Sequence, residues 1–280
     1  MSKRAVAARA KKTDMRAAKA QAAALRHARF KAKLALRDTL TFSKNNAKVT
    51  GHIISLPAGH ACVFANTCLA FAHRDTGKIT DGENAIVRCF AATGESWASN
   101  ARAIHWHNFD LLRACRTAPE MVALIARSLP QDAQLVRIHA AGDYFNQRYF
   151  DAWLEIARAL PQVTFYSYTK ALPFWINRLH CIPQNFHLTA SKGGTHDHLI
   201  ALHNLRYAEV FNYAREARAA GLPIDHDDTH AWKTPGSFAL LIHGTQRAGS
   251  VQAKAWSVQR AAKRKAKLRA AAKAAAAAAA

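Results

Sequence analysis

"AQLVRIHAAGDYFNQRYFDAWLEIARALPQVTFYSYTK", residues 133–170, is the stretch that decides the fold. Its first apolar run, residues 133–143, predicts a buried strand, and residues 163–170 predict a second one. Between them, the apolar residues of 145–160 recur at the spacing of one helix face. The buried stripe of this helix is predicted to comprise Phe150, Trp153, Leu154, Ile156 and Ala157. A strand, a helix and a strand in this order predict a βαβ unit with parallel strands.

The same alternation continues on both sides of this unit. A helical pattern interrupted at Pro119 precedes it, and further helix-like and strand-like segments follow at 172–179, 185–194, 207–221 and 237–246. Repeated βα units predict an α/β fold, either a partial (β/α) barrel or an open parallel sheet with flanking helices. In such folds the functional residues lie just beyond the C-terminal ends of the strands.

Four of the predicted strands end in polar or glycine-containing motifs. These motifs are Gly142-Asp143, Thr169-Lys170, Ser191-Lys192-Gly193-Gly194 and His243-Gly244. Because parallel strands point the same way, their ends would direct polar groups toward one rim of the sheet. An aspartate before a helix is also a common N-cap, so capping of the following helix is the alternative for Asp143.

Composition indicates one globular body between two basic tails. Half of the 280 residues are apolar, which is enough for a sizeable core. The net charge of +22 is concentrated in residues 1–44, with 13 Lys/Arg against two acids, and in residues 247–280, with nine against none. Residues 45–246 carry 18 Lys/Arg against 16 acids and form the predicted α/β body.

Both tails are rich in alanine, lysine and arginine, which is typical of basic helices or of disordered segments. Such tails bind the phosphates of DNA or RNA without reading sequence, because counterions are released. We therefore predict nucleic acid as a partner, with a merely solubilising pair of tails as the alternative. The sequence has no run of 18 uncharged apolar residues and no apolar secretion signal, so we expect a cytoplasmic protein that does not enter a membrane.

Three of the five cysteines suggest a metal centre. Cys62, Cys68 and Cys89 form a C-x5-C-x20-C pattern, and clustered thiolates suit zinc or an iron–sulfur cluster. Three thiolates on a four-iron cluster leave one iron open, whereas structural zinc needs a fourth protein ligand. The candidates for that ligand are His60, His73 and Cys115. Buried unreactive cysteines are the alternative, and Cys181 is interpreted as structural.

The order of these parts resembles the first half of a radical S-adenosylmethionine (SAM) barrel: a cysteine cluster, then strands that end in Gly-Asp, in Tyr-Thr-Lys and in Ser. More narrowly, "SLPAGHACVFANTC", "RCFAA", "VRIHAAGDYFNQRYFDAWLEIA" and "FYSYTKA" resemble the phage-encoded gene product 88 domain family. The similarity covers roughly residues 50–250 and excludes both tails. The C-x3-C-x2-C loop usual in radical SAM enzymes is absent.

The radical SAM resemblance implies an iron–sulfur cluster on Cys62, Cys68 and Cys89, with SAM as a second cofactor. The reduced cluster would cleave the sulfonium bond of SAM, and the radical formed would abstract hydrogen from a substrate, for which we expect a nucleotide or nucleic acid. The resemblance also implies roles for residues at the strand ends. Asp143 would bind the amino group of SAM, Thr169, Lys170 and Ser191 its carboxylate or ribose, and Tyr144, Tyr166 or Tyr168 its adenine.

Two further functions from other classes compete with this hypothesis. In "IHWHN" (104–108), His105 and His107 flank an apolar residue, as in some metal-dependent DNA-nicking nucleases of replication initiation, with Tyr144 or Tyr149 as the nucleophile. Residues two positions apart share a face only on a strand, and this stretch predicts a helix instead. The other alternative is a non-enzymatic nucleic-acid-binding protein with structural zinc. The polar run "GLPIDHDDTHAW" (221–232) is interpreted as a turn with aspartate caps rather than a cation site.

Overall fold

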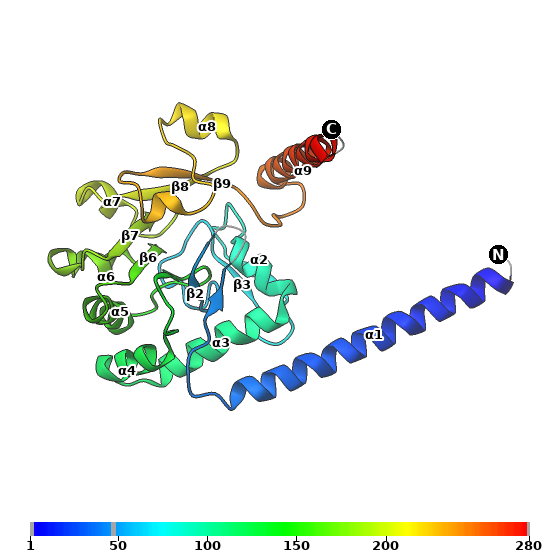
Figure 1. Cartoon of the computed structure of the whole chain (residues 1–280), viewed down its shortest axis with the longest axis horizontal. Helices are drawn as coiled ribbons and strands as arrows, with labels where there is room; N and C mark the ends of the chain where they lie inside the picture. Colours follow the sequence, from blue (N-terminus) through cyan, green and yellow to red (C-terminus); the bar gives the residue numbers. More distant parts are fainter. Residues whose placement is uncertain (1–2, 46–48, 279–280) are drawn as a thin grey trace.

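The computed structural model describes residues 3–45 and 49–278, and it consists of one α/β body from which two helices extend (Figure 1). A seven-stranded sheet lies at its centre, in the order β1-β2-β5-β6-β7-β8-β9. The strands are β1 (Ser43–Lys44), β2 (His52–Ile54), β5 (Leu135–Ile138), β6 (Thr164–Thr169), β7 (Phe186–Ser191), β8 (Tyr207–Phe211) and β9 (Phe238–Leu241).

All neighbouring strands from β2 to β9 are parallel, and only the two-residue β1 runs antiparallel to its neighbour. Because these strands follow one another in the sheet as they do in the sequence, their C-terminal ends lie along one rim in chain order. The strands form an open sheet in linear order. Of the two predicted architectures, the open parallel sheet with flanking helices is therefore confirmed.

Helices between the strands cover one face of the sheet. They are α3 (Ser99–Ala114), α4 (Ala118–Ser128), α5 (Gln147–Ala159), α6 (Leu172–Ile176) and α7 (His198–Leu202). The five residues predicted for the buried stripe of α5 are all at most 2% exposed and belong to the main apolar core. The interruption expected at Pro119 is a boundary: α3 ends at Ala114, and Pro119 lies in the first turn of α4, where Thr117 accepts a hydrogen bond from the Glu120 amide.

The other face of the sheet carries a smaller core. Tyr166 and Phe238 pack there against Ala231 of the short 3-10 helix η2 (Thr229–Ala231). Just before η2, the chain also pairs with the outer edge of β9, because the Ala239 amide donates to Pro223 O (2.8 Å) and the Asp225 amide to Ala239 O (2.9 Å). Segment 223–231 therefore closes both the second face and the edge of the sheet.

The remaining elements were not anticipated from the sequence or are short. They are the hairpin β3 (Ala70–Ala72) and β4 (Ile79–Asp81), α2 (Phe90–Trp97), the 3-10 helix η1 (Leu179–Cys181) and α8 (Ala214–Ala219). The hairpin and α2 lie in the long segment between β2 and α3 that carries the cysteines. The hairpin strands have three residues each, which is too short for a recognisable alternation of apolar and polar residues.

Most of each basic tail is helical over the residues described, which leave out 1–2 and 279–280. The N-terminal tail forms α1 (Lys3–Ala35), about 50 Å long, and the C-terminal tail forms α9 (Val251–Ala278). Both project from the body (Figure 1). Leu34 and Leu40 are 5% exposed, so the tail predicted over 1–44 joins the body before residue 44. Among the described helices, none is both long enough and apolar enough to cross a membrane.

His139 is a buried histidine at the end of β5 and provides a test of the core. Its Nε2 lies 3.1 Å from the Tyr149 hydroxyl, while Nδ1 has no hydrogen-bond partner among the residues that the structure describes. Burial, reinforced by the charge of Arg137, lowers the pKa of His139 to about 3. The unfolded chain therefore takes up a proton near pH 6.5 that the folded chain excludes until about pH 3.

The free energy of unfolding is therefore expected to fall between pH 6.5 and pH 3, by up to about 1.4 kcal/mol per pH unit from this residue. Urea unfolding of the natural chain and of His139→Gln at pH 7 and pH 5 measures this contribution. The variant should lose less stability than the natural chain on acidification. Parallel losses in the two proteins would contradict the assignment.

Candidate functional site

The loop that follows β2 crosses the C-terminal ends of the parallel strands and binds to the end of β7. The amides of Asn66 and Thr67 donate to Gly193 O at 3.2 and 3.0 Å, and the Thr195 amide donates to Phe64 O at 3.0 Å. Gly193 has a φ of +100°, and a Cβ there would lie 2.4 Å from Thr67 Oγ1. The loop with Cys62 and Cys68 is thus fixed above the sheet by a contact that needs glycine.

The third cysteine is held beside the second one by two sets of bonds. The amides of Ile86 and Val87 donate to Thr67 O at 2.8 and 3.0 Å. The Gln246 side chain accepts from the Arg88 amide at 2.8 Å and donates to Arg88 O at 3.0 Å. Since Gln246 follows β9, residues from both β7 and β9 position the cysteine-bearing loop.

A buried glutamate connects the segments of the first and third cysteines. Glu95 lies in α2, which begins directly after Cys89, and it is 1% exposed. Its Oε1 accepts from the Ala58 amide at 3.0 Å and lies 2.7 Å from His105 Nδ1, while Oε2 has no hydrogen-bond partner in the described part of the chain. The sequence provides no signal for this role, because Glu95 and Ala58 are 37 residues apart.

The three cysteines are near enough to influence one another electrostatically. Burial raises the pKa of Cys62 well above its usual value, and the charges of Asp143, Cys89 and Cys68 raise it further. Burial, followed by the charge of Cys68, raises the pKa of Cys89 to about 12. The bonds from the Ile86 and Val87 amides to Thr67 O bring the segments of Cys68 and Cys89 together, and we call Cys62, Cys68 and Cys89 the cysteine triangle. Within residues 3–45 and 49–278, no three His, Cys, Asp or Glu side chains are arranged to hold one metal ion.

The predicted fourth ligands of a zinc site have other partners. The His60 ring packs against Phe71 and Trp106, with ring centroids 5.1 and 4.7 Å away. His73 Nδ1 accepts from the amides of its own turn, and Cys115 Sγ contacts Leu111 O. None of these contacts is with the cysteine triangle.

Asp143 joins the ends of two strands instead of capping a helix. Its Oδ1 accepts from the Thr169 hydroxyl (2.6 Å) and from the Tyr144 amide, and its Oδ2 accepts from the Lys170 amide (2.7 Å). The N-cap of α5 is Asn146, whose side chain accepts from the Tyr149 amide. Burial raises the pKa of Asp143, and the hydrogen bonds from Thr169, Lys170 and Tyr144 oppose that shift.

Lys170 continues this connection to β7. Its Nζ donates to Ser191 O (2.8 Å), Ser191 Oγ (2.7 Å) and Lys192 O (2.8 Å), although the residue is only 8% exposed. The Lys192 ammonium in turn pairs with Glu209 of β8 at 2.8 Å. A continuous series of polar contacts therefore runs across the C-terminal ends of β5, β6 and β7 and reaches Glu209 in the middle of β8, and we call it the rim network.

The tyrosines predicted to bind adenine lie away from this rim. Tyr144 is fully buried against the rings of His139 and Phe150. Tyr166 and Tyr168 lie under segment 223–231, with their hydroxyls 3.4 Å from Asp228 Oδ2 and 3.5 Å from Asp225 Oδ2.

The polar run at 221–232 folds as the turn expected from its sequence. Asp227 Oδ1 accepts from the Thr229 amide (3.2 Å) and the Thr229 hydroxyl (2.6 Å). Asp228, which has a φ of +64°, forms a buried ion pair with Arg137 on β5. The ion pair fastens the turn to the second face of the sheet.

The two histidines of the nuclease hypothesis have different partners. Both lie on α3, where residues two apart point in nearly opposite directions. His105 contacts Glu95, whereas His107 Nε2 lies 3.0 Å from Thr39 O. Tyr144 and Tyr149, the proposed nucleophiles, are both 0% exposed. This geometry provides no metal-binding pair and no accessible nucleophile among these four residues.

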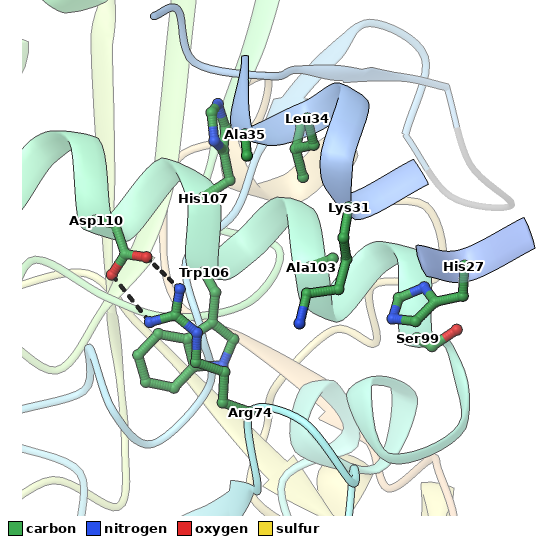
Figure 2. A pocket seen from close by; sticks show the side chains of 10 residues that line it. All are labelled: His27, Lys31, Leu34, Ala35, Arg74, Ser99, Ala103, Trp106, His107 and Asp110. Atoms are coloured by element: carbon green, nitrogen blue, oxygen red, sulfur yellow. Dashed lines mark hydrogen bonds and ion pairs between the residues drawn. The ribbon is translucent and has the colours of Figure 1, made fainter. Parts of the chain in front are cut away.

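A cavity of about 270 Å³ lies between α1 and α3, away from the cysteine triangle (Figure 2). The Arg74 guanidinium lies 4.7 Å from the centre of the Trp106 ring and pairs with Asp110 (Figure 2). Lys31 of α1 pairs with Asp75 at 3.2 Å. The Lys31–Asp75 ion pair beside this cavity connects α1 with the body.

The rim network predicts that Asp143→Asn destabilises the fold. The amide NH2 group replaces one carboxylate oxygen, so a buried donor loses its acceptor, at a cost of about 1–3 kcal/mol in the free energy of unfolding. Asp75→Asn is the control, because the Asp75 side chain is 66% exposed and pairs with Lys31 at the surface. Urea unfolding of both variants tests this. Equal losses in the two variants would show that Asp143 has no special structural role.

Comparison with known proteins assigns the chain to a family. A family model described as Gene product 88 matches residues 11–272. The Gene 88 proteins of Mycobacterium phage L5 and Mycobacterium phage D29 are 27% and 25% identical to it over 135 residues. Each match covers 45% of this chain and 56% of the relative, so the chain spans about half the length of these relatives. No solved structure matches. The family model covers most of the chain, which confirms the resemblance seen in the sequence: the chain belongs to the Gene product 88 family.

Proposed function

We propose that this phage protein binds an iron–sulfur cluster through Cys62, Cys68 and Cys89 and uses it with SAM in the cytoplasm of the host cell. The observation that carries the proposal is the cysteine triangle itself. It lies in a loop at the C-terminal rim of a parallel sheet whose strands follow chain order, and bonds from Gly193 and Gln246 fix that loop.

The chemistry of the triangle fits a cluster. Thiolates are soft ligands that suit iron–sulfur clusters, and each cysteine of a four-iron cluster binds a different iron atom. They therefore need not converge on one point, as the ligands of zinc must. When bound, a reduced cluster supplies the electron that cleaves the sulfonium bond of SAM.

The residues of the rim would then divide into binding and positioning groups. The Thr169 hydroxyl donates to Asp143 and accepts from the Ala171 amide, and all three protons of the Lys170 ammonium are directed at oxygens. Both residues therefore position the rim. A carboxylate accepts about four hydrogen bonds, so Asp143 keeps capacity for an amino group, and the Ser191 hydroxyl keeps its proton for a carboxylate or ribose. Tyr144 belongs to the core in this proposal.

Anaerobic purification with iron, sulfide and zinc analysis tests the cluster. We expect a brown protein with about four irons per chain. Cys62→Ala, Cys68→Ala or Cys89→Ala should lower the iron content at least twofold. Cys181→Ala is the matched control, because Cys181 lies in η1 outside the triangle, and it should keep its iron. A colourless natural protein with one zinc or no metal would exclude the proposed chemistry.

A second observation supports nucleic acid as a partner. Every lysine and arginine side chain between Arg16 and Arg29 of α1 is exposed. The same holds for every lysine and arginine between Arg260 and Arg269 of α9. α9 contains eight lysines and arginines and no acidic residue. Two projecting basic helices would contact phosphates from one molecule and would hold a polyanion near the body.

The salt dependence of binding tests this interaction. In Arg16→Gln/Lys19→Gln/Arg26→Gln, three exposed charges of α1 are lost, so the slope of log K against log salt concentration should decrease by up to about three for duplex DNA. Titration of a labelled duplex at several salt concentrations measures the slope. The control exchanges Arg74, Arg88 and Arg178, whose charges are paired with acids, for glutamine in one variant. Identical slopes in all three proteins would contradict a phosphate contact by α1.

A further inference from the structure

A row of aromatic rings connects the basic helix α9 with the cysteine triangle. Phe90 directly follows Cys89 in the sequence, and its ring centroid lies 4.3 Å from that of His243. The His243 ring in turn lies 6.5 Å from the ring of Trp256 in α9. Phe90 is 42% exposed, and both other rings are half-buried. We call Phe90, His243 and Trp256 the aromatic row.

The beginning of α9 is packed on the body, and its remainder carries exposed positive charge. Ala255 is fully buried, and the Gln259 side chain donates to Asn212 O at 2.8 Å. Beyond this contact every described side chain is exposed. The basic ones are Arg260, Lys263, Arg264, Lys265, Lys267 and Arg269. A charged helix therefore leads to the aromatic row, and the aromatic row leads to Cys89.

Charge followed by partly exposed rings suits one class of nucleic acid. Lysine and arginine attract the phosphates of any strand, whereas an aromatic ring stacks only on a base whose face is open. In a duplex the base faces are covered by neighbouring base pairs. In a single strand they are free, and stacking on protein rings contributes to affinity without reading sequence.

We propose that the aromatic row and α9 bind single-stranded nucleic acid and direct it to the cysteine triangle. This inference rests on the proposed nucleic-acid binding and adds which form is bound, where it lies and where it leads. The phosphates contact α9 between Arg260 and Arg269. Bases stack on Trp256 and Phe90, so that the strand ends its path beside Cys89.

Binding of two labelled probes to the full chain tests the proposal. The probes are an oligothymidylate of about 15 nucleotides, within the range bound by one single-strand site, and a duplex of equal length. The natural chain should bind the single strand more tightly than the duplex. Trp256→Leu should raise the Kd for the single strand about tenfold and change that for the duplex less than twofold. Phe90→Leu should have the same direction of effect and serves as a second variant if Trp256→Leu fails to fold.

Two controls separate stacking from charge and from loss of structure. Trp97→Leu removes a tryptophan that is 77% exposed but lies outside the aromatic row, and it should leave both Kd values unchanged. Lys263→Gln/Lys265→Gln/Lys267→Gln should weaken the binding of both probes and lower the slope of log K against log salt concentration. Trp256→Leu removes no charge and should therefore keep this slope. Circular dichroism and the unfolding midpoint verify that each variant is folded.

Each outcome supports or overturns the inference. Selective loss of single-strand binding in Trp256→Leu and Phe90→Leu supports it. The inference is overturned if Trp256→Leu and Trp97→Leu change the Kd for the single strand equally, or if the natural chain binds the duplex more tightly. In either case the proposed binding of nucleic acid by the basic helices still stands. If neither probe binds, nucleic-acid binding and this inference fail together, and the iron content still decides the proposed cluster separately.

Discussion

The rest of the structure depends on one buried carboxylate. Asp143 receives hydrogen bonds from a hydroxyl and two backbone amides, and two of these donors belong to residues at the end of β6. A buried charge without such donors would cost more than the fold can supply. Its bonds therefore fix the relative position of β5 and β6 at the rim, and Lys170 extends the same constraint to β7. Gly142 makes this geometry possible, because its φ is +82° and a Cβ there would lie 2.6 Å from Leu56 Cβ.

Above this rigid rim, the cysteine-bearing loop is fixed almost entirely through backbone groups. Gly193 O and Thr67 O each accept two amides, and the Gln246 amide binds the backbone of Arg88. Such bonds need few particular side chains, so they leave a weak signature in the sequence. The side chains of Gln246 and Glu95 are exceptions, and Glu95 joins α2 to the segment before Cys62.

Much of the fold could be predicted from the sequence, because long amphipathic helices and apolar strands are local patterns. The βαβ unit at 133–170 and the buried stripe of α5 followed from spacing alone. An aspartate before a helix suggests a cap, but the cap of α5 is Asn146, which satisfies the same local rule three residues after Asp143. Tyr144 is a candidate for stacking on adenine in the sequence, but its ring is buried in the core. The partners of Glu95, His105 and Gln246 depend on contacts between distant segments, and no spacing in the chain encodes those.

The pairing of segment 223–225 with β9 also determines how copies of the chain meet. An open parallel sheet has two edges, and an uncovered edge is a template on which another copy can add its own strand. Here one edge ends in the two-residue β1, and the other is the four-residue β9, in which Ala239 is already bonded to segment 223–225. Neither edge offers a long ladder for polymerisation, and the charge of +22 makes copies repel one another. The molecule is consequently protected against edge-to-edge aggregation, even though its sheet never closes on itself.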